Sequence, residues 1–279
     1  MIGFIADFFE SDIRGGAEQN DSVLLDHLRK KHDIKELLSR ECTIEKIKDC
    51  NFLIIGNFTH LEQEVKNYIS SQKKYIIYEH DHKYIKTRDP SKFKDFKIPK
   101  SQIINEDFYR SAKKIVCLGK KQVEIINDCF DFNDDKCFSI STSLWSEEKL
   151  NYILNLQDSL KKSENFAIMN SQNPIKNTKK SVTFCEKNNL KYSLIHSVDH
   201  NDFLIKISEC QGLVFFPGVL ESMSRLVMEA KMLDCKIITT PRLLGAWYEP
   251  WFKKSGKELI KSVRQNVAVA LQKFEELIE

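Results

Sequence analysis

The chain has 279 residues, which exceeds the usual single domain and predicts one large or two small domains. Apolar residues make up 42% of it, with 18 Phe and only 9 Gly and 6 Pro, so the composition supports a packed core and excludes intrinsic disorder. The net charge of +3 is a weak excess and does not indicate nucleic-acid binding, although a nucleic-acid enzyme with a local basic patch stays an alternative.

Cysteine usage and the N-terminal sequence indicate the cellular location. The eight cysteines form no C-x-x-C pair and stand mostly in apolar contexts, which favours buried reduced thiols in a cytosolic protein. The N-terminus, MIGFIADFFESD, becomes acidic too soon for a signal peptide. No apolar run reaches about 18 residues, so we expect no membrane span. We expect a cytoplasmic protein, with association to the cytoplasmic face of a membrane left open.

The first half of the chain is typical of a βα series. Strands are predicted at Ile2–Phe9, Phe52–Ile55, Tyr75–Tyr78, Ile115–Leu118 and Cys137–Ile140, and helices at Ala17–Lys31, Ile44–Cys50, Leu61–Ser70 and Lys121–Asn127. Gly15 and Gly16 separate the first strand from its helix. Glycines before a helix N-terminus allow a ligand close to the backbone and favour anion binding, while an ordinary tight turn is the alternative.

The third strand ends in EHDHKY, which places His80 and His82 on one side of an extended segment. Asp81 points to the other side and no third ligand is evident, so a hydrogen-bonding histidine, for substrate or for the fold, is favoured over a zinc site. The Lys-rich stretch 83–100 follows and is interpreted as a surface loop. It is either simply solvated or a surface for the acceptor or a membrane.

The second half repeats the pattern after a helical junction at 146–164. Strands are predicted at Phe166–Met169, Tyr192–His196, Leu213–Phe216 and 237–240, and helices at Thr178–Lys187, Asp202–Cys210 and from about Ser224 onward. A helix at Glu258–Glu279 ends the chain with an apolar stripe of Val263, Val267, Ala270, Leu271 and Phe274. Two consecutive α/β series predict two Rossmann-like domains, with a ligand bound in the cleft between them.

The segment 212–240 carries the strongest functional signal. Its strand, loop, helix and strand form a βαβ unit, with Glu221 in the loop and Glu229 in the helix. Both carboxylates could then face a ligand above the carboxyl end of the sheet, binding sugar or ribose hydroxyls, or be satisfied by backbone amides. Ser222 or Ser224 is expected to cap the helix, whose N-terminus favours a diphosphate. Arg225 and Lys176 are candidate phosphate contacts.

These residues resemble the E-x7-E signature of retaining glycosyltransferases of family 4, which have the GT-B fold. The match covers Pro217, Glu221 and Glu229 with the apolar residues between the two Glu residues and the strand that follows. In the same order along the chain, Gly15 and Gly16 resemble the family's N-terminal glycine loop, His80 its first-domain His, and Lys176 the Lys that opens its second domain.

The resemblance implies transfer of a sugar from a nucleotide-diphosphate sugar, UDP- or GDP-linked, with retained anomeric configuration and with no metal or other cofactor. Glu229 would hold the ribose, and Glu221 and His80 the transferred sugar, with His82 as the competing histidine. Gly15, Gly16 and Lys176, with the helix start at Ser224, Arg225 and Leu226, would bind the diphosphate. The implied domains are 1–160 on the acceptor side, 161–250 on the donor side, and a helix within 251–279 that crosses back to the first.

Departures from the family pattern keep a second class of function in view. Ser171 stands where the family has an Arg, Asn177 where it has a Gly after the Lys, and Ser224 where it has a Gly at the helix start. Loss of the Arg removes a diphosphate contact, for which Arg225 or Arg14 would substitute. The alternatives are a nucleotide-sugar-binding protein without turnover and a nucleic-acid-modifying glycosyltransferase. The acceptor and the oligomeric state are not indicated.

Overall fold

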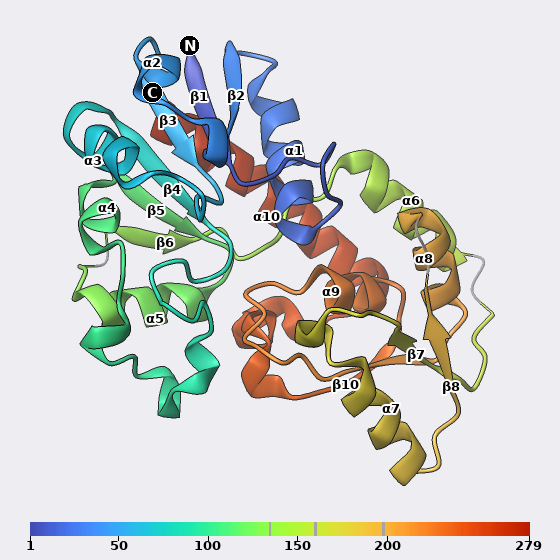
Figure 1. The fold of residues 1–279 in the computed structure, drawn as a ribbon. Helices are drawn as coiled ribbons and strands as arrows, with labels where there is room; N and C mark the ends of the chain where they lie inside the picture. The colour runs from blue at the N-terminus through green and yellow to red at the C-terminus, as the bar shows by residue number, and fades with distance from the viewer. Residues whose placement is uncertain (134, 159–160, 197–198) are drawn as a thin grey trace. The chain divides into compact units, whose positions relative to one another are not determined.

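The computed structural model describes residues 1–133, 135–158, 161–196 and 199–279. The chain divides into two compact units, one formed by Met1–Trp145 with Asn266–Glu279 and the other by Ser146–Gln265. The limits between these units lie at residues 145 and 265, whereas the sequence predicts domain limits at 160 and 250. Each unit is an α/β layer structure around its own parallel sheet, as the sequence predicts (Figure 1).

In the part of the chain that is described, the first unit holds a six-stranded sheet in the order β2-β1-β3-β4-β5-β6, all pairs parallel. Its strands are β1 (Ile2–Ala6), β2 (Ile34–Leu38), β3 (Phe52–Ile55), β4 (Tyr75–Glu79), β5 (Lys114–Cys117) and β6 (Cys137–Ser139). Every residue of β1, β3 and β4 is buried. Strands buried on both faces carry continuous apolar runs, which is why the sequence predicts these three.

Helices connect these strands: α1 (Gly16–Leu28), α2 (Ile44–Ile47), α3 (Gln63–Gln72), α4 (Glu106–Ser111) and α5 (Lys120–Phe130). β2 and α4 are not predicted from the sequence. β2 is an edge strand with the sequence IKELL, and its central Lys and Glu interrupt the apolar pattern. α4 has only six residues and starts after Asn105, which takes a left-handed conformation with φ 56°. Neither element has the length or periodicity that supports a prediction.

The second unit contains the four-stranded parallel sheet β10-β9-β7-β8. Its strands are β7 (Phe166–Met169), β8 (Tyr192–Ile195), β9 (Gly212–Phe215) and β10 (Lys236–Thr239), and its helices are α6 (Glu147–Asp158), α7 (Thr178–Lys187), α8 (His200–Ser208) and α9 (Arg225–Met232). β9 and β10 pair in parallel, and α9 lies between them in the chain, so the predicted βαβ unit is confirmed.

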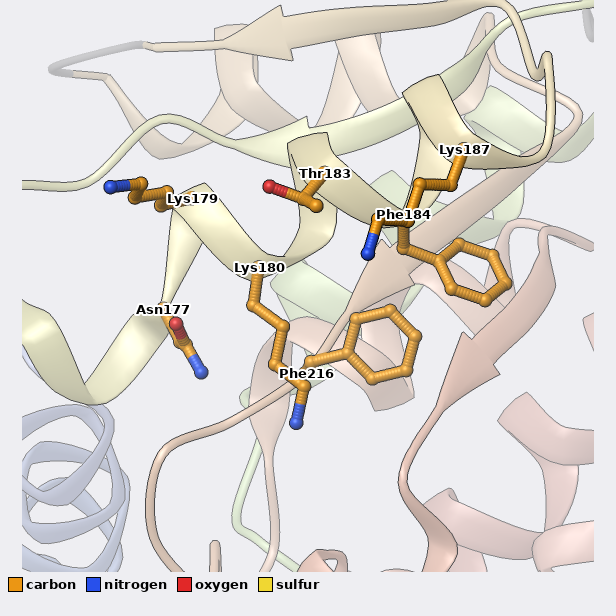
Figure 2. A pocket seen from close by; sticks show the side chains of 7 residues that line it. All are labelled: Asn177, Lys179, Lys180, Thr183, Phe184, Lys187 and Phe216. Carbon is orange, nitrogen blue, oxygen red and sulfur yellow. The ribbon is translucent and has the colours of Figure 1, made fainter.

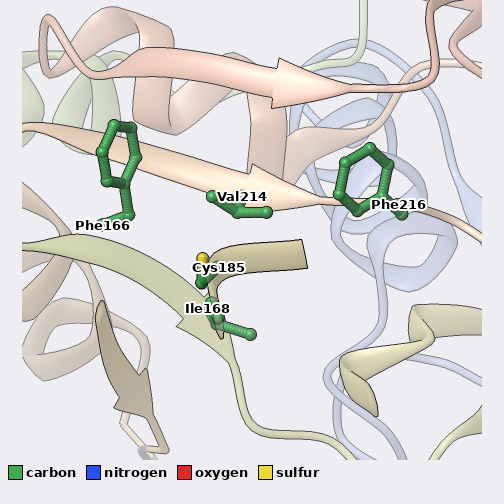
Figure 3. Packing of buried hydrophobic residues seen from close by; sticks show 5 residues of the cluster. All are labelled: Phe166, Ile168, Cys185, Val214 and Phe216. Carbon is green, nitrogen blue, oxygen red and sulfur yellow. The ribbon is translucent and has the colours of Figure 1, made fainter. Parts of the chain in front are cut away.

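A compact apolar cluster joins α7 to this sheet. It comprises Phe166 and Ile168 from β7, Cys185 from α7, and Val214 and Phe216 from β9 and its end (Figure 3). All five are buried, and Phe216 is the most exposed of them at 8%. Burial of these side chains fixes the position of α7, and with it the loop that leads from β7 into the helix.

The last helix, α10 (Gly256–Ile278), contributes to both units, with residues up to Gln265 in the second and from Asn266 in the first. In the first unit, Phe274 packs edge-on against Tyr78 with ring centroids 4.9 Å apart, and Glu275 accepts from Lys31 at 2.9 Å. In the second unit, Arg264 donates to Glu147 at 2.9 Å. Val263, Val267, Ala270 and Phe274 of the predicted stripe are buried.

Short 3-10 helices complete the fold at Ser39–Glu41, Pro90–Lys92, Lys94–Phe96, Lys100–Gln102, Pro174–Lys176, Pro241–Leu243, Gly245–Tyr248 and Pro250–Lys253. All eight cysteines are free thiols, and seven are buried. Within residues 1–133, 135–158, 161–196 and 199–279, no helix combines the length and apolar character needed to cross a bilayer.

Candidate functional site

The loop between β9 and α9 positions the two predicted glutamates. Glu221 lies before the helix and forms a β-bridge with Leu244, while Glu229 lies on the buried face of α9. The Glu229 side chain is 2% exposed and the Glu221 side chain 15%. Both carboxylates are therefore held in a largely dehydrated environment, where charged partners contribute more than in water.

Lys176 is brought to Glu221. It ends the 3-10 turn Pro174–Lys176 that follows β7, and its Nζ lies 2.8 Å from Glu221 Oε1. The next residue, Asn177, takes the left-handed conformation with φ 50° and begins α7 as its N-cap. Glycine and asparagine are the residues that adopt this conformation most readily, which explains how Asn177 serves where the resembled family has Gly.

Glu229 is contacted by two basic side chains of the same unit. Arg225, one turn earlier on α9, places Nη2 3.6 Å from Glu229 Oε1, and His200, the first residue of α8, places Nε2 3.1 Å from Oε2. The histidine contact lacks the alignment of a hydrogen bond, so it is an ion pair when the imidazole is protonated. His200 is not among the site residues predicted from the sequence. The only signal for it is its position shortly after β8, at the carboxyl end of a parallel strand.

Two buried serine hydroxyls line the start of α9. Ser222 is 8% exposed and Ser224 is 2% exposed, and neither Oγ has a hydrogen-bond partner within the described part of the chain. Ser224 stands at the N-cap position, but its side chain makes no capping hydrogen bond, so the expected cap is wrong in that respect. Leaving a buried hydroxyl unpaired costs about 1–3 kcal/mol, which a polar ligand would offset. Leu226 is apolar and buried, so it could contact a ligand only through its backbone.

Gly245 packs closely against the backbone at Glu221 and Ser222 and is hydrogen-bonded to it. Its N–H donates to the Glu221 carbonyl at 2.8 Å, and Glu221 N–H donates to Leu243 O at 3.0 Å. A Cβ at position 245 would lie 2.1 Å from the Ser222 carbonyl oxygen, an atom that moves only if the loop moves. Gly245 could not be predicted from the sequence, because the contact joins segments more than twenty residues apart.

We expect Gly245→Ala to destabilise the protein by about 1–3 kcal/mol, because the added methyl group overpacks a rigid backbone contact. Chemical denaturation measures the loss. Gly15→Ala is the control, since its Cβ would meet the carboxylate of Glu18, the movable end of a flexible side chain. Equal losses in the two variants would contradict the account of Gly245.

In the first unit, the predicted glycine loop leads into α1 with Gly15 as N-cap and Gly16 as the first helical residue. Glu18 lies in the first turn and is 9% exposed. Burial raises the pKa of Glu18, and the neighbouring carboxylate of Asp21 raises it further. The first turn of this helix therefore already contains an acidic side chain, which works against binding a second anion there.

His80 and His82 are both buried, with different partners. His80 Nε2 lies 2.9 Å from Asp21 Oδ1, and its Nδ1 has no hydrogen-bond partner among the residues described. His82 has φ 63°, and its Nδ1 lies 2.6 Å from the Tyr84 hydroxyl. His82 Nε2 likewise has no hydrogen-bond partner among the residues described, so each histidine keeps one ring nitrogen for a substrate and the choice between them stays a prediction.

Burial lowers the pKa of His82 from 6.5 to about 4. A histidine whose pKa is depressed in the folded state contributes stability above its unfolded pKa and loses it as the pH falls. We therefore expect the wild-type protein to lose roughly 2–3 kcal/mol of unfolding free energy between pH 7 and pH 4.5 beyond the loss in His82→Asn. Asparagine is the matched replacement because it accepts positive φ and does not titrate there. Urea denaturation at both pH values checks this, and identical losses would refute it.

The stretch 83–100 is only partly the surface loop that the sequence predicts. Lys83 is 2% exposed, and its Nζ donates to Glu79 Oε1 at 2.8 Å. Although burial of Glu79 opposes ionisation, the Lys83 charge and hydrogen bond lower its pKa below the usual value. Tyr84, Ile85, Asp89, Pro90 and Phe96 are also buried. The interpretation as a surface loop is wrong for these residues, because Lys83 pairs with Glu79 at the end of β4 and Tyr84 packs against Tyr109 and Phe130.

The predicted site residues thus form two groups, one in each unit. Gly15, Gly16 and His80 belong to the first, and Lys176, Ser224, Arg225, Leu226, Glu221 and Glu229 to the second. Among the described residues, no group of three or more His, Cys, Asp and Glu side chains is arranged to hold a metal ion.

Solved structures establish the fold. The chain is similar to Alr3699/HepE from Anabaena in complex with UDP, with a TM-score of 0.53, 11% identity, and coverage of 97% of this chain and 94% of that one. The chain has the GT-B fold. AviGT4, a glycosyltransferase of avilamycin A biosynthesis, is similar at a TM-score of 0.50 and 10% identity over 99% of this chain and 96% of that one. HepE in complex with UDP-glucose also matches at 0.50 and 11%, over 99% and 91%.

No protein-family model and no curated protein sequence matches the chain. At identities of 10–11%, the similarity to these structures shows the fold of the backbone alone. The GT-B fold hosts its chemistry in side chains that differ between proteins, so function has to be argued from the site.

Proposed function

We propose that the protein is a retaining glycosyltransferase that moves a sugar from a nucleotide-diphosphate sugar to an acceptor. The observation that carries the proposal is the Lys176–Glu221 pair at 2.8 Å, formed between the loop after β7 and the loop after β9. Both loops follow the carboxyl ends of neighbouring parallel strands, where open α/β sheets bind their ligands.

Each polar group of this site has a task in such a reaction. The ammonium of Lys176 would neutralise charge that develops on the diphosphate as the bond to the sugar breaks. Glu221 would accept hydrogen bonds from the sugar hydroxyls, and Glu229 from the ribose. The hydroxyls of Ser222 and Ser224, buried and without a partner in the described residues, would bind phosphate oxygens at the start of α9.

Protein groups compensate for the buried charges of the site. Lys176 neutralises Glu221, while Arg225 and His200 lie beside Glu229. A donor would exchange these contacts for its own diphosphate and hydroxyl groups. Buried charges without any partner would destabilise the fold, so these ion pairs within the protein are what we expect of a polar site with buried charges.

The choice of donors to test rests on the resemblance and on the neighbours. The structures of HepE hold UDP and UDP-glucose, which makes a uridine-linked sugar the first donor to test, followed by GDP-linked sugars. The roles of Gly15, Gly16 and His80 remain predictions from the family resemblance, as does metal independence. A cytoplasmic location remains a prediction from the cysteine content and the N-terminal sequence. The acceptor is open.

One observation favours a second candidate, a nucleotide-sugar-binding protein without turnover. Ser171, at the position of the resembled family's Arg, serves the local turn instead: its N–H donates to Thr178 Oγ1 at 3.1 Å and its Oγ accepts from Asn173 N–H at 3.2 Å. No cation replaces the Arg at that point of the chain. Arg225 is the substitute within the same unit, and it lies beside Glu229.

A panel of UDP- and GDP-sugars tests the proposal. We expect the purified protein to bind at least one donor and release its nucleoside diphosphate, and the first-formed sugar to keep the donor's anomeric configuration in proton NMR. Donor binding without release would favour the binding protein. An inverted first product would contradict retention, and no binding of any donor would contradict both candidates.

A further inference from the structure

On one face of the sheet of the second unit, helix α7 is narrower than the four strands together. Strands lie about 4.8 Å apart, so a four-stranded sheet is roughly 14–19 Å wide, whereas a helix with its side chains is about 10–12 Å across. Helix α7 packs on β7 and β9 on this face. Beside α7 lies a groove of about 520 Å³, lined by Asn177, Lys179, Lys180, Thr183, Phe184, Lys187 and Phe216 (Figure 2).

The wall of the groove is cationic. Lys179, Thr183 and Lys187 recur every four residues, so they follow one side of α7 over about 12 Å. Lys180 extends over the Phe216 ring, with its Nζ 5.4 Å from the ring centroid. No acidic side chain is among the seven lining residues. The one acidic residue of α7, Glu186, faces elsewhere and lies 3.4 Å from the Tyr192 hydroxyl.

The floor of the groove is apolar. The rings of Phe184 and Phe216 pack with centroids 5.0 Å apart, and Phe184 keeps part of its surface in the groove. Figure 2 shows the two rings next to each other, with the Lys180 side chain extending alongside Phe216. Ile175, two residues before the lining residue Asn177, is 41% exposed and adds an apolar side chain to the surface of the preceding turn. An apolar floor beneath a row of ammonium groups is complementary to an amphiphilic anion.

The lysines are placed against the local preference of the helix. Lys179 and Lys180 occupy the first turn of α7, which has no acidic residue. The positive end of a helix dipole favours acidic side chains and disfavours lysine there. The arrangement concentrates positive potential at one end of the groove.

We propose that this groove binds an anionic lipid at a membrane surface, with the phosphate at the lysines and the apolar part over Phe184 and Phe216. The proposal goes beyond sugar transfer and uses none of the residues assigned to the donor. A bilayer surface presents many phosphates to the row of lysines at once, and the exposed Ile175 can enter the interfacial region.

A single-stranded nucleic acid fits these observations less well. Such ligands stack their bases on exposed aromatic faces. Phe216 is only 8% exposed, lies under Lys180, and is packed against Phe184. The aromatic surface is therefore a floor for an apolar chain and not a stacking platform.

Flotation with vesicles tests the proposal. The wild-type protein should float with vesicles of equal parts phosphatidylcholine and phosphatidylglycerol and stay below vesicles of phosphatidylcholine alone. Because each lysine near an anionic surface contributes about a fivefold factor, Lys179→Glu with Lys187→Glu should weaken binding at least about 25-fold. Glutamate suits the first turn of α7, so the melting temperature should not fall through Lys179→Glu.

The matched control is Lys236→Glu with Lys253→Glu, which makes the same charge change at two exposed lysines of the same unit outside the groove. Vesicles should also protect Lys179, Lys180 and Lys187 from acetylation more than Lys236 and Lys253. The proposal fails if the wild-type protein does not float, if both double variants lose binding equally, or if the groove lysines bind oligothymidylate in place of vesicles. Donor release is measured separately, so failure here leaves the proposed transfer untouched.

Discussion

Lys176→Ala should lower the turnover number for donor consumption by about 100-fold to 1000-fold, the effect of removing one group that stabilises charge in a transition state. In the structure, its ammonium lies 2.8 Å from Glu221 and its side chain is 27% exposed, so its charge acts in a partly dehydrated environment. The Michaelis constant should change less than the turnover number, because the charge on the diphosphate grows as the bond breaks. Steady-state release of nucleoside diphosphate measures both constants.

The control is Lys236→Ala, which removes an exposed lysine from the start of β10 in the same unit. It should retain the wild-type rate. Glu221→Gln tests the charge of Glu221 separately from its size. Glutamine has nearly the same size and can still form hydrogen bonds, but it removes the ion pair with Lys176. A Lys176→Ala variant with unchanged turnover would remove Lys176 from the mechanism.

Lys83→Ala should destabilise the protein by about 3–5 kcal/mol, because it leaves the Glu79 carboxylate buried without its cation. Glu79 is fully buried, and it accepts from Lys83 Nζ at 2.8 Å and from Asp81 N–H at 3.0 Å, with the Tyr109 hydroxyl as a further donor. The pKa of Glu79 is lowered in the folded state, so the stability from this pair is present at neutral pH and lost as the pH falls through the acid range. Chemical denaturation at pH 7 measures the effect.

Lys86→Ala is the comparison, since Lys86 belongs to the same segment and its side chain is exposed. It should change the unfolding free energy by less than about 0.5 kcal/mol. The double variant Glu79→Gln with Lys83→Met should be more stable than Lys83→Ala, because it removes both charges together. A loss below about 1 kcal/mol in Lys83→Ala would show that water reaches Glu79 and that the pair is not buried in solution.

The regular elements could be predicted where burial leaves a clear pattern. Phe52–Ile55, Phe166–Met169 and Thr178–Lys187 have the predicted limits, because buried parallel strands need unbroken apolar runs and α7 has turn residues before it. The edge strand Ile34–Leu38 has charged residues at its centre. Its pairing with β1 comes from the sheet, and local sequence does not encode it.

The candidate site could be predicted only as far as spacing and resemblance reach. The positions of Glu221 in a loop and Glu229 on a helix follow from the apolar pattern around them. The contact of His200 with Glu229 joins residues of two helices and leaves no periodic trace. The burial of Lys83 runs against the usual exposure of lysine, and only Glu79 at the end of the preceding strand explains it.

Calorimetric titration of UDP, GDP and their nucleosides into the wild-type, Lys176→Ala and Glu229→Ala proteins tests the central claim, that the second unit binds a nucleoside diphosphate at these side chains. The wild-type protein should bind one of the diphosphates. Glu229→Ala should lower the affinity for the diphosphate and for its nucleoside alike, by about tenfold or more, because a charged hydrogen bond is lost. Lys176→Ala should lower the affinity for the diphosphate alone. Wild-type affinity in both variants, or no diphosphate binding by the wild-type protein, would contradict the account.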